Sequence, residues 1–330
     1  MKKQWTGFQS ALAIHIERFI ACKRALGRRY DIEEKTLRLL DRSLIKNGIQ
    51  QPCEVTPEHI EKFLASRPRP RPRSYNHLLC TVRRLFDWMV IQEVLEHSPV
   101  QAQPKRRLSQ RAPFIFDIHS AKRLLDVARR LPERPKAPMR GVTYHAIFAI
   151  LYGLGLRVGE ACRLMIKDVD FNRKLLVIQQ TKFYKSRLVP FGPKLEMLLL
   201  EYLQMRNKKF GAPFLDAPFF SFTKRGEIHP CTVSQTFHRL IPRLKLDIPL
   251  GCSPPRLHDL RHSFAVGTLT RWYRSGINPG TGLLKLSTFL GHVDTNSTAI
   301  YLTMTPDLLQ EANQRFERFT ADIITEEISQ

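Results

Sequence analysis

The chain has 330 residues, enough for two ordinary domains that each bury a core of their own. Lys and Arg number 53 against 30 Asp and Glu, which gives a formal net charge of +23. This surplus favours a polyanionic partner, because cations that neutralise phosphates release condensed counterions. A basic protein without such a partner is the alternative. No run of about 18 apolar residues is present, which argues against a transmembrane helix and a membrane partner.

The N-terminus and the cysteines predict the compartment. Two lysines follow Met1, but no apolar segment stands behind them, which argues against a secretory signal. The six cysteines are scattered without a CxxC pair, so we expect neither a disulfide scaffold nor a structural zinc site. We therefore expect a cytoplasmic protein and, with the basic charge that favours nucleic acid, a nucleoid-associated one.

The first 103 residues are predicted to form a helical domain. Apolar residues at helical spacing predict helices over 8–26, 32–45 and 75–94. Thr56 and Pro57 are typical of a helix cap and a first helical position, and the short helix that follows ends at Ala65.

A basic, proline-rich segment stands between the last two of these helices. Residues 67–73 alternate arginine with proline, a pattern that forbids helix and favours an extended chain. Such a stiff row of guanidinium groups suits a phosphate backbone, although a solvated loop is the simpler interpretation. The DNA-binding candidates here are Arg67, Arg69, Arg71 and Arg73, with Arg83 and Arg84 beside the apolar stripe of the next helix.

Residues 104–113 are predicted to link this domain to a second one over 114–330. The composition from 98 to 113 is polar and basic, with three prolines and no periodicity. Its cations Lys105, Arg106 and Arg107 are further DNA-binding candidates.

The second domain is predicted to be mainly α with a small β part, an α+β fold. Helices are predicted over 119–130, 144–154, 194–208, 232–244 and 259–273, and in a C-terminal tail over 307–319. Two β-prone runs, 175–181 and 186–191, surround a short basic turn and predict a hairpin.

Two arginine segments are candidates for phosphate chemistry. Arg157 stands among glycines at the end of an apolar helix, where it either pairs with Glu160 or faces a phosphate. His258 and Arg261 are three residues apart and share a helix face. His258 and Arg261 could together bind one phosphate in its transition state. The alternative is a histidine and an arginine that merely lie on a helix surface, because HxxR is a short pattern.

A lysine and a tyrosine complete the candidate chemistry. Lys182 lies in the hairpin turn, where most lysines are simply solvated. Tyr301 follows His292 by nine residues. Its phenolate could attack phosphorus and form a covalent ester if cations surround it, because the free pKa of tyrosine is near 10. A packed aromatic side chain is the alternative for Tyr301.

These segments together resemble the tyrosine recombinase (phage integrase) family. The catalytic order R, K, HxxR, H, Y is matched by Arg157, Lys182, His258, Arg261, His292 and Tyr301. The stretches YGLGLRVGEACRL, TKFYKSRLVP, LHDLRHSFA and LGHVDTNSTAIYL resemble that family's boxes in sequence and order. The N-terminal part resembles its helical, SAM-like core-binding domain, so the likeness covers nearly the whole chain.

The resemblance implies a mechanism. Tyr301 attacks the scissile phosphate and leaves a 3′-phosphotyrosyl bond and a free 5′-hydroxyl. Arg157 and Arg261 hold the non-bridging oxygens, His258 and His292 bond the phosphate, and Lys182 protonates the leaving oxygen. The resemblance also implies that Glu160 and Asp259 orient Arg157 and the HxxR helix.

The resemblance further implies partners and alternatives. Exchange of one phosphodiester for another needs no ATP, metal or other cofactor. Double-stranded DNA is the expected partner, bound by a homotetramer or by an assembly with related recombinases, with the C-terminal tail docked on a neighbouring subunit. A catalytically silent DNA-binding accessory protein and a topoisomerase IB-like relaxing enzyme are the alternatives. The stretch 268–290 is longer than the compact loop expected of Xer-like members, which leaves a Xer-like or a transposon-borne enzyme open.

Overall fold

The computed structural model describes residues 7–106, 112–179, 186–277, 279–292, 294–303, 309–311, 313–314 and 316–317. The chain divides into two compact units, Met1–Gln110 and Arg111–Gln330. This division falls within the stretch 104–113 that the sequence suggests as a linker. Within the described part of the chain, no helix is both long and apolar enough to cross a bilayer.

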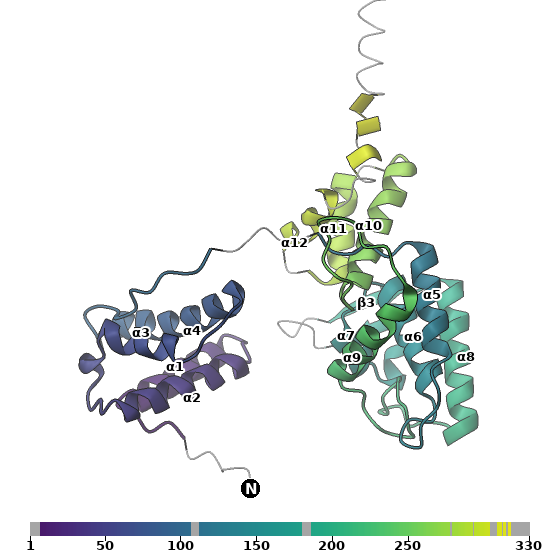
Figure 1. Ribbon diagram of the computed structural model, residues 1–330. Coiled ribbons are helices and arrows are strands. Elements are labelled where there is room, and N and C mark those ends of the chain that lie inside the picture. The colour runs from purple at the N-terminus through teal and green to yellow at the C-terminus, as the bar shows by residue number, and fades with distance from the viewer. Residues whose placement is uncertain are drawn as a thin grey trace, which may run out of the picture. The chain divides into compact units, whose positions relative to one another are not determined.

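The first unit is helical, as the sequence predicts (Figure 1). Its elements are α1 (Ala13–Ala25), α2 (Asp31–Lys46), the 3-10 turn η1 (Pro52–Glu54), α3 (Pro57–Ala65) and α4 (Pro72–Ile91). The apolar stripes of these helices meet in one core, to which Phe19, Leu37 and Leu85 belong. Asp41 is buried in α2 and accepts the backbone N–H of Ser10 at 2.9 Å, which fixes the chain ahead of α1.

The arginine–proline segment differs from its prediction at one end. Residues 67–71 are not helical, but α4 begins at Pro72, so Arg73 lies in its first turn. Proline is tolerated there because the N–H that it lacks would have no partner in the helix. The predicted extended segment is therefore two residues too long.

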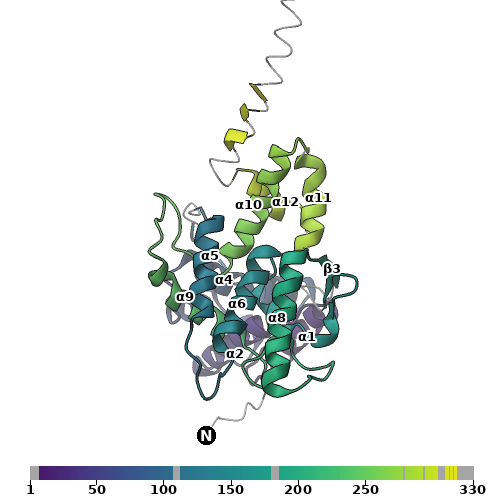
Figure 2. The same cartoon turned by 90° about the vertical axis from the view of Figure 1, so that its right-hand side faces the viewer.

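The second unit is mainly helical. Its helices are α5 (Ile118–Arg129), α6 (Arg140–Gly153), α7 (Val158–Arg163), α8 (Pro193–Phe210), α9 (Pro230–Leu240), α10 (Asp259–Arg274), α11 (Pro279–Leu290) and α12 (Asn296–Ala299). Short 3-10 turns are η2 (Ile166–Asp168), η4 (Ile241–Leu244) and η5 (Ile300–Thr303). Helix α6 is apolar on nearly every side and buried, and α5 and α8 run beside it (Figures 1 and 2).

A small antiparallel sheet lies against this helical body. It contains β1 (Val169–Asp170), β2 (Leu175–Ile178) and β3 (Arg187–Pro190) in that spatial order. Leu176 pairs with Val189, and both are buried. Strands β2 and β3 therefore pair as the predicted hairpin requires, while its turn, with Lys182, lies outside the described residues.

Two segments differ from expectation. The stretch 268–290, expected as a long connection, is mostly helical: α10 continues to Arg274 and α11 begins at Pro279. The short helix α7 was not predicted, because six residues are too few to show a period. The predicted tail helix over 307–319 lies largely outside the described residues.

Helices α10, α11 and α12 gather at one end of the second unit (Figures 1 and 2). They enclose a small apolar cluster that is separate from the main core. Its buried members are Ala265, Val266, Leu269, Leu286, Leu290 and Tyr301. Tyr301, the candidate nucleophile, is thus packed in this small cluster and not in the main core.

Candidate active site

The turn from α6 into α7 places Arg157. Gly155 has a φ of +61°, which favours glycine, and a Cβ there would lie 2.6 Å from a ring carbon of Phe264 on α10. The glycine thus allows α10 to approach the turn. Arg157 then caps α7, and both its backbone N–H and its guanidinium donate to the Glu160 carboxylate, at 2.9 and 2.8 Å.

Glu160 is a buried anion of the site, with 4% of its surface exposed. Besides the two bonds from Arg157, it accepts a bidentate pair from Arg187 on β3, at 3.0 and 2.9 Å. Burial acts to raise the pKa of Glu160, but the bonds and charges of Arg187 and Arg157 outweigh it and lower the pKa to about 2. The carboxylate is therefore ionised and joins α7 to the hairpin strand.

Among the described residues of the site, Arg261 is the most deeply buried cation, with 1% exposed. It donates to the carbonyl oxygens of Gly155, at 2.6 Å, and Leu290, at 2.7 Å. Burial and then the positive charge of Arg157 lower the pKa of Arg261 to about 9. Carbonyl partners hold the guanidinium in place but leave its positive charge uncancelled, as an anion-binding group requires.

Three arginines meet the C-terminal end of α11. Arg187 donates to the Phe289 carbonyl at 2.9 Å, Arg261 to that of Leu290, and Arg157 to the Gly291 carbonyl at 3.0 Å. The last carbonyls of a helix have no partner within the helix and carry its partial negative charge. This end of α11 therefore brings the two predicted phosphate-binding arginines, Arg157 and Arg261, to one place.

The histidines lie close by. His258 is the N-cap residue of α10, and part of its side chain is exposed. Desolvation of the ring by neighbouring protein atoms, and then the charges of Arg261 and Arg157, lower the pKa of His258 to about 4. His292 follows α11, and its Nδ1 lies 2.7 Å from the Thr298 hydroxyl. Burial and then the charge of Arg261 lower the pKa of His292 to about 4. Both rings are neutral near pH 7 in the free protein.

Tyr301 is buried beside these groups, with 2% exposed. Its hydroxyl lies 3.0 Å from Nδ1 of His262, and its ring stacks near that of His292 with centroids 6.4 Å apart. Burial raises the pKa of Tyr301, while the charges of Arg261 and Arg157 act to lower it. The arginines are thus close enough to stabilise a phenolate.

Asp259 lies fully buried in the first turn of α10. Its carboxylate accepts the backbone N–H of Arg256 at 2.8 Å and the Arg256 guanidinium at 3.1 Å. Burial raises the pKa of Asp259, although these bonds oppose the rise. Asp259 therefore ties the start of α10 to the loop before it.

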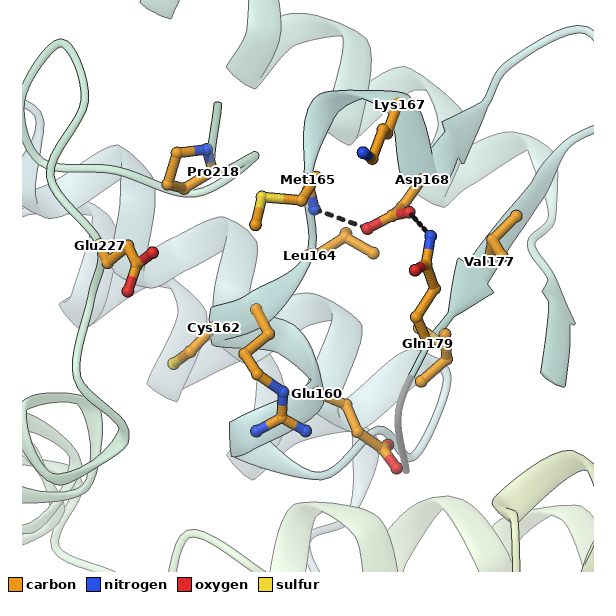
Figure 3. Close-up of a pocket in the computed structure, with 12 residues that line it drawn as sticks. Glu160, Cys162, Leu164, Met165, Lys167, Asp168, Val177, Gln179, Pro218 and Glu227 are labelled. Carbon is orange, nitrogen blue, oxygen red and sulfur yellow. Dashed lines mark hydrogen bonds between the residues drawn. The ribbon is translucent and has the colours of Figure 1, made fainter. Parts of the chain in front are cut away.

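Lys182 lies outside the described residues, but the strand that leads to it is anchored. Figure 3 shows a pocket at the end of β2, lined by Asp168 and Gln179, with Glu160 at its edge. Asp168 accepts from the Gln179 amide at 2.6 Å and from the Met165 backbone at 2.9 Å (Figure 3). Among the described residues, this pocket's lining does not include Tyr301.

The predicted DNA-binding residues all belong to the first unit. Arg83 is half-buried and donates to the Ala102 carbonyl, and the Lys105 ammonium lies 4.6 Å from the Tyr75 ring centroid. Arg67 is half-buried as well. The exposed members are Arg69, Arg71, Arg73, Arg84, Lys105 and Arg106, and Arg107 lies outside the described residues.

Sequence reasoning missed two residues of this site. Arg187 shares the inward face of β3 with buried Val189, whereas Leu188 between them is exposed; this alternation was a usable signal. His262 on α10 stands four residues after His258, the N-cap of that helix, so the two rings lie on the same side. Both residues stand inside stretches that already matched the family.

Comparisons with known proteins show the family of the chain. Residues 117–307 match the model of the phage integrase family. The y4rB protein of Sinorhizobium fredii, named provisionally as an integrase/recombinase, is 33% identical over 305 residues, covering 92% of this chain and 96% of that protein. The chain belongs to the phage integrase family.

Other relatives share this assignment. The tyrosine recombinase XerC of Oceanobacillus iheyensis is 26% identical over 276 residues, covering 82% of this chain and 83% of its own. The integrase of the Tn1549 transposon, solved with transposon right-end DNA, shares the fold with a TM-score of 0.64 at 16% identity, covering 93% of this chain and 99% of that one. The lambda integrase dimer solved on a core site has a TM-score of 0.60 at 16% identity, with 88% and 76% covered.

These matches confirm the family, the mainly α fold with a small sheet and the enzyme class predicted from the sequence. The protein is a site-specific recombinase of the tyrosine class. None of the matches favours an accessory protein or a topoisomerase.

Proposed function

We propose that this recombinase cuts and rejoins double-stranded DNA through a 3′-phosphotyrosyl bond at Tyr301. The observation that carries the proposal is the meeting of Tyr301 with Arg157 and Arg261, which come from three separate elements of the chain. A buried phenol beside two guanidinium groups whose charge no carboxylate fully cancels suits attack on an anionic phosphate.

The proposed steps assign each group one task. Arg157 and Arg261 bind the non-bridging oxygens and stabilise the charge that the transition state adds. His258 and His292, both neutral in the free protein, hydrogen-bond the same phosphate. Lys182 gives a proton to the 5′-oxygen as it leaves. The steps run in reverse when a new 5′-hydroxyl attacks the phosphotyrosine.

Glu160 and Asp259 act through other residues in this proposal. Glu160 fixes Arg157 and joins it to Arg187, and Asp259 fixes the start of the HxxR helix. No step needs a metal or another cofactor.

We also propose how the protein assembles and where it works. The unit before 104 would bind DNA as a clamp, with its exposed arginines on the phosphate backbone, joined by the linker 104–113 to a catalytic domain over 114–330. Lambda integrase has been solved as a tetramer on a Holliday junction, which supports a tetramer of this chain, or a mixed assembly, on DNA in the nucleoid.

The test is covalent trapping without metal or ATP. Purified protein is mixed with nicked suicide duplexes from its own genomic neighbourhood and separated on a denaturing gel. We expect a protein–DNA band for the wild type and none for Tyr301→Phe, with duplex binding kept. Tight binding without any covalent band would overturn the enzymatic proposal in favour of an accessory role.

A further inference from the structure

His262 is in contact with the reacting atom of the proposed nucleophile, yet the six-residue signature leaves it without a task. Its Nδ1 lies 3.0 Å from the Tyr301 hydroxyl oxygen. The imidazole is 13% exposed, and Tyr301 is 2% exposed. The hydrogen bond is therefore largely shielded from bulk water, so a side chain has to accept the phenol proton that water would otherwise take.

The charge state of His262 leaves it able to accept a proton. Burial first, and then the charge of His258, lower the pKa of His262 to about 3. The ring is therefore neutral near pH 7 and has one nitrogen lone pair. With its proton on Nε2, that lone pair is on Nδ1 and faces Tyr301. Nε2 then faces the buried Asp259, whose Oδ1 lies 3.9 Å away.

We propose that His262 is the general base of the cleavage step: it takes the phenol proton of Tyr301, and Asp259 stabilises the imidazolium that forms. This inference rests on the proposed function. As the Tyr301 oxygen bonds to phosphorus, its proton moves to Nδ1 of His262, the bond from phosphorus to the 5′-oxygen breaks, and that oxygen takes its proton from Lys182. Rejoining returns both protons.

The other histidines are less well placed for this task. His292 Nδ1 is already engaged by the Thr298 hydroxyl. His258 packs edge-on against His262, with ring centroids 4.7 Å apart, and makes no hydrogen bond to Tyr301 among the described residues. Of the three rings, His262 alone has a hydrogen bond to the phenol oxygen in this part of the chain.

The charges around His262 explain why it would take the proton only when substrate is present. The cations that face it are, in order of effect, His258 when protonated, Arg256, Arg261 and His292 when protonated. The anion is Asp259, and Tyr301 is the donor. A bound phosphate adds negative charge beside Arg261, offsets these cations and favours the imidazolium. In the free protein near pH 7, burial together with the charges of Arg256 and Arg261 keeps the ring neutral.

The test is the pH dependence of single-turnover cleavage of a nicked suicide duplex by wild type, His262→Asn and His262→Ala. The Asn amide can keep a hydrogen bond to the phenol near the Nδ1 position but cannot take its proton. We expect both variants to cleave about 10²- to 10⁴-fold more slowly at pH 7 with DNA binding unchanged. The deficit should shrink as the pH rises towards the pKa of tyrosine, because the phenol then ionises by itself.

A second substrate separates the base from the acid. With sulfur in place of the 5′-oxygen, the leaving group needs no proton, so this duplex should rescue Lys182→Ala but not His262→Asn. His145→Asn is the matched control, because His145 is also half-buried and its Nδ1 bonds only a carbonyl, that of Leu125, at 3.0 Å. It should lower stability without slowing cleavage.

The outcomes are distinguishable. Suppose that the wild type cleaves. If His262→Asn cleaves as fast as the wild type, or is slower by the same factor at every pH, the role of His262 is overturned and the proposed function stands. A wild type that forms no covalent complex on any duplex overturns both. A deficit at pH 7 that disappears at high pH, with no rescue by sulfur, supports the general base.

Discussion

The buried carboxylate of Glu160 is the best place to test how the site is held together. Glu160→Gln keeps the shape of the side chain but removes its charge, and leaves Arg187, whose side chain is 9% exposed, without its anion. The pKa of Glu160 falls from 4.5 to about 2 in the folded protein. Each tenfold change in proton affinity is worth about 1.4 kcal/mol, so folding favours the ionised carboxylate by about 3 kcal/mol.

The same magnitude follows from general experience with buried ion pairs, because removal of one partner costs about 3–5 kcal/mol. The sign with pH is also fixed. Because the folded-state pKa is the lower one, the stabilisation is complete above pH 4.5 and is lost as the pH falls towards about 2. The gap in stability between wild type and Glu160→Gln should therefore be about 3 kcal/mol at pH 7 and shrink below pH 4.5.

Urea unfolding at several pH values measures this gap, with hydrogen exchange of the α7 segment to separate the second unit from the first. Glu201→Gln is the matched control, because Glu201 pairs with Arg129 while 48% exposed, and such pairs contribute about 0–1 kcal/mol. If Glu160→Gln costs no more than this control, or its cost does not change with acid, the account of Glu160 is wrong.

Other substitutions test the rest of the site. Gly155→Ala should lower the free energy of unfolding by about 2–4 kcal/mol, measured by heat or urea, because alanine disfavours a positive φ and its Cβ would clash with Phe264 on α10. Gly267→Ala is the control: it lies within α10 with open space around the added Cβ, and should raise the free energy of unfolding by about 0.5–1 kcal/mol. Arg187→Lys cannot reproduce three fixed contacts and should slow single-turnover cleavage about 10- to 10²-fold; an unchanged rate would exclude a positioning role. Replacing Arg69 and Arg71 with Gln should weaken duplex binding and reduce the slope of log affinity against log salt by about 2, and an unchanged slope would remove them from the interface.

The sequence predicted most of the helices because their apolar residues recur at helical spacing over more than ten positions. Helix α3 was placed at Pro57–Ala65 because its cap and first-position proline are local signals. Helix α7 could not be predicted in this way, because six residues contain fewer than two turns. Strand β1 has only two residues and is defined by its pairing with β2, which no local pattern reports.

The sequence indicated which residues are candidates for the site, but not which atoms they contact in the folded protein. Arg157, Arg261 and Tyr301 were proposed from spacing and resemblance, and they lie near one another in the structure. That the Leu290 and Gly291 carbonyls hold the two arginines depends on how α11 ends beside α7 and α10, which is a tertiary fact. The same holds for the contact between the Tyr301 hydroxyl and His262.

The end of α11 has a further consequence for control. Arg187, Arg261 and Arg157 donate one hydrogen bond each to three successive backbone carbonyls at the end of this helix. The positions of the three guanidinium groups are therefore not independent. A shift of α11 along its axis would displace all three guanidinium groups together, so the site would be assembled or dismantled as a unit rather than by degrees. Any subunit that contacts this helix, for instance at its exposed Leu284, would then act on cleavage as a switch.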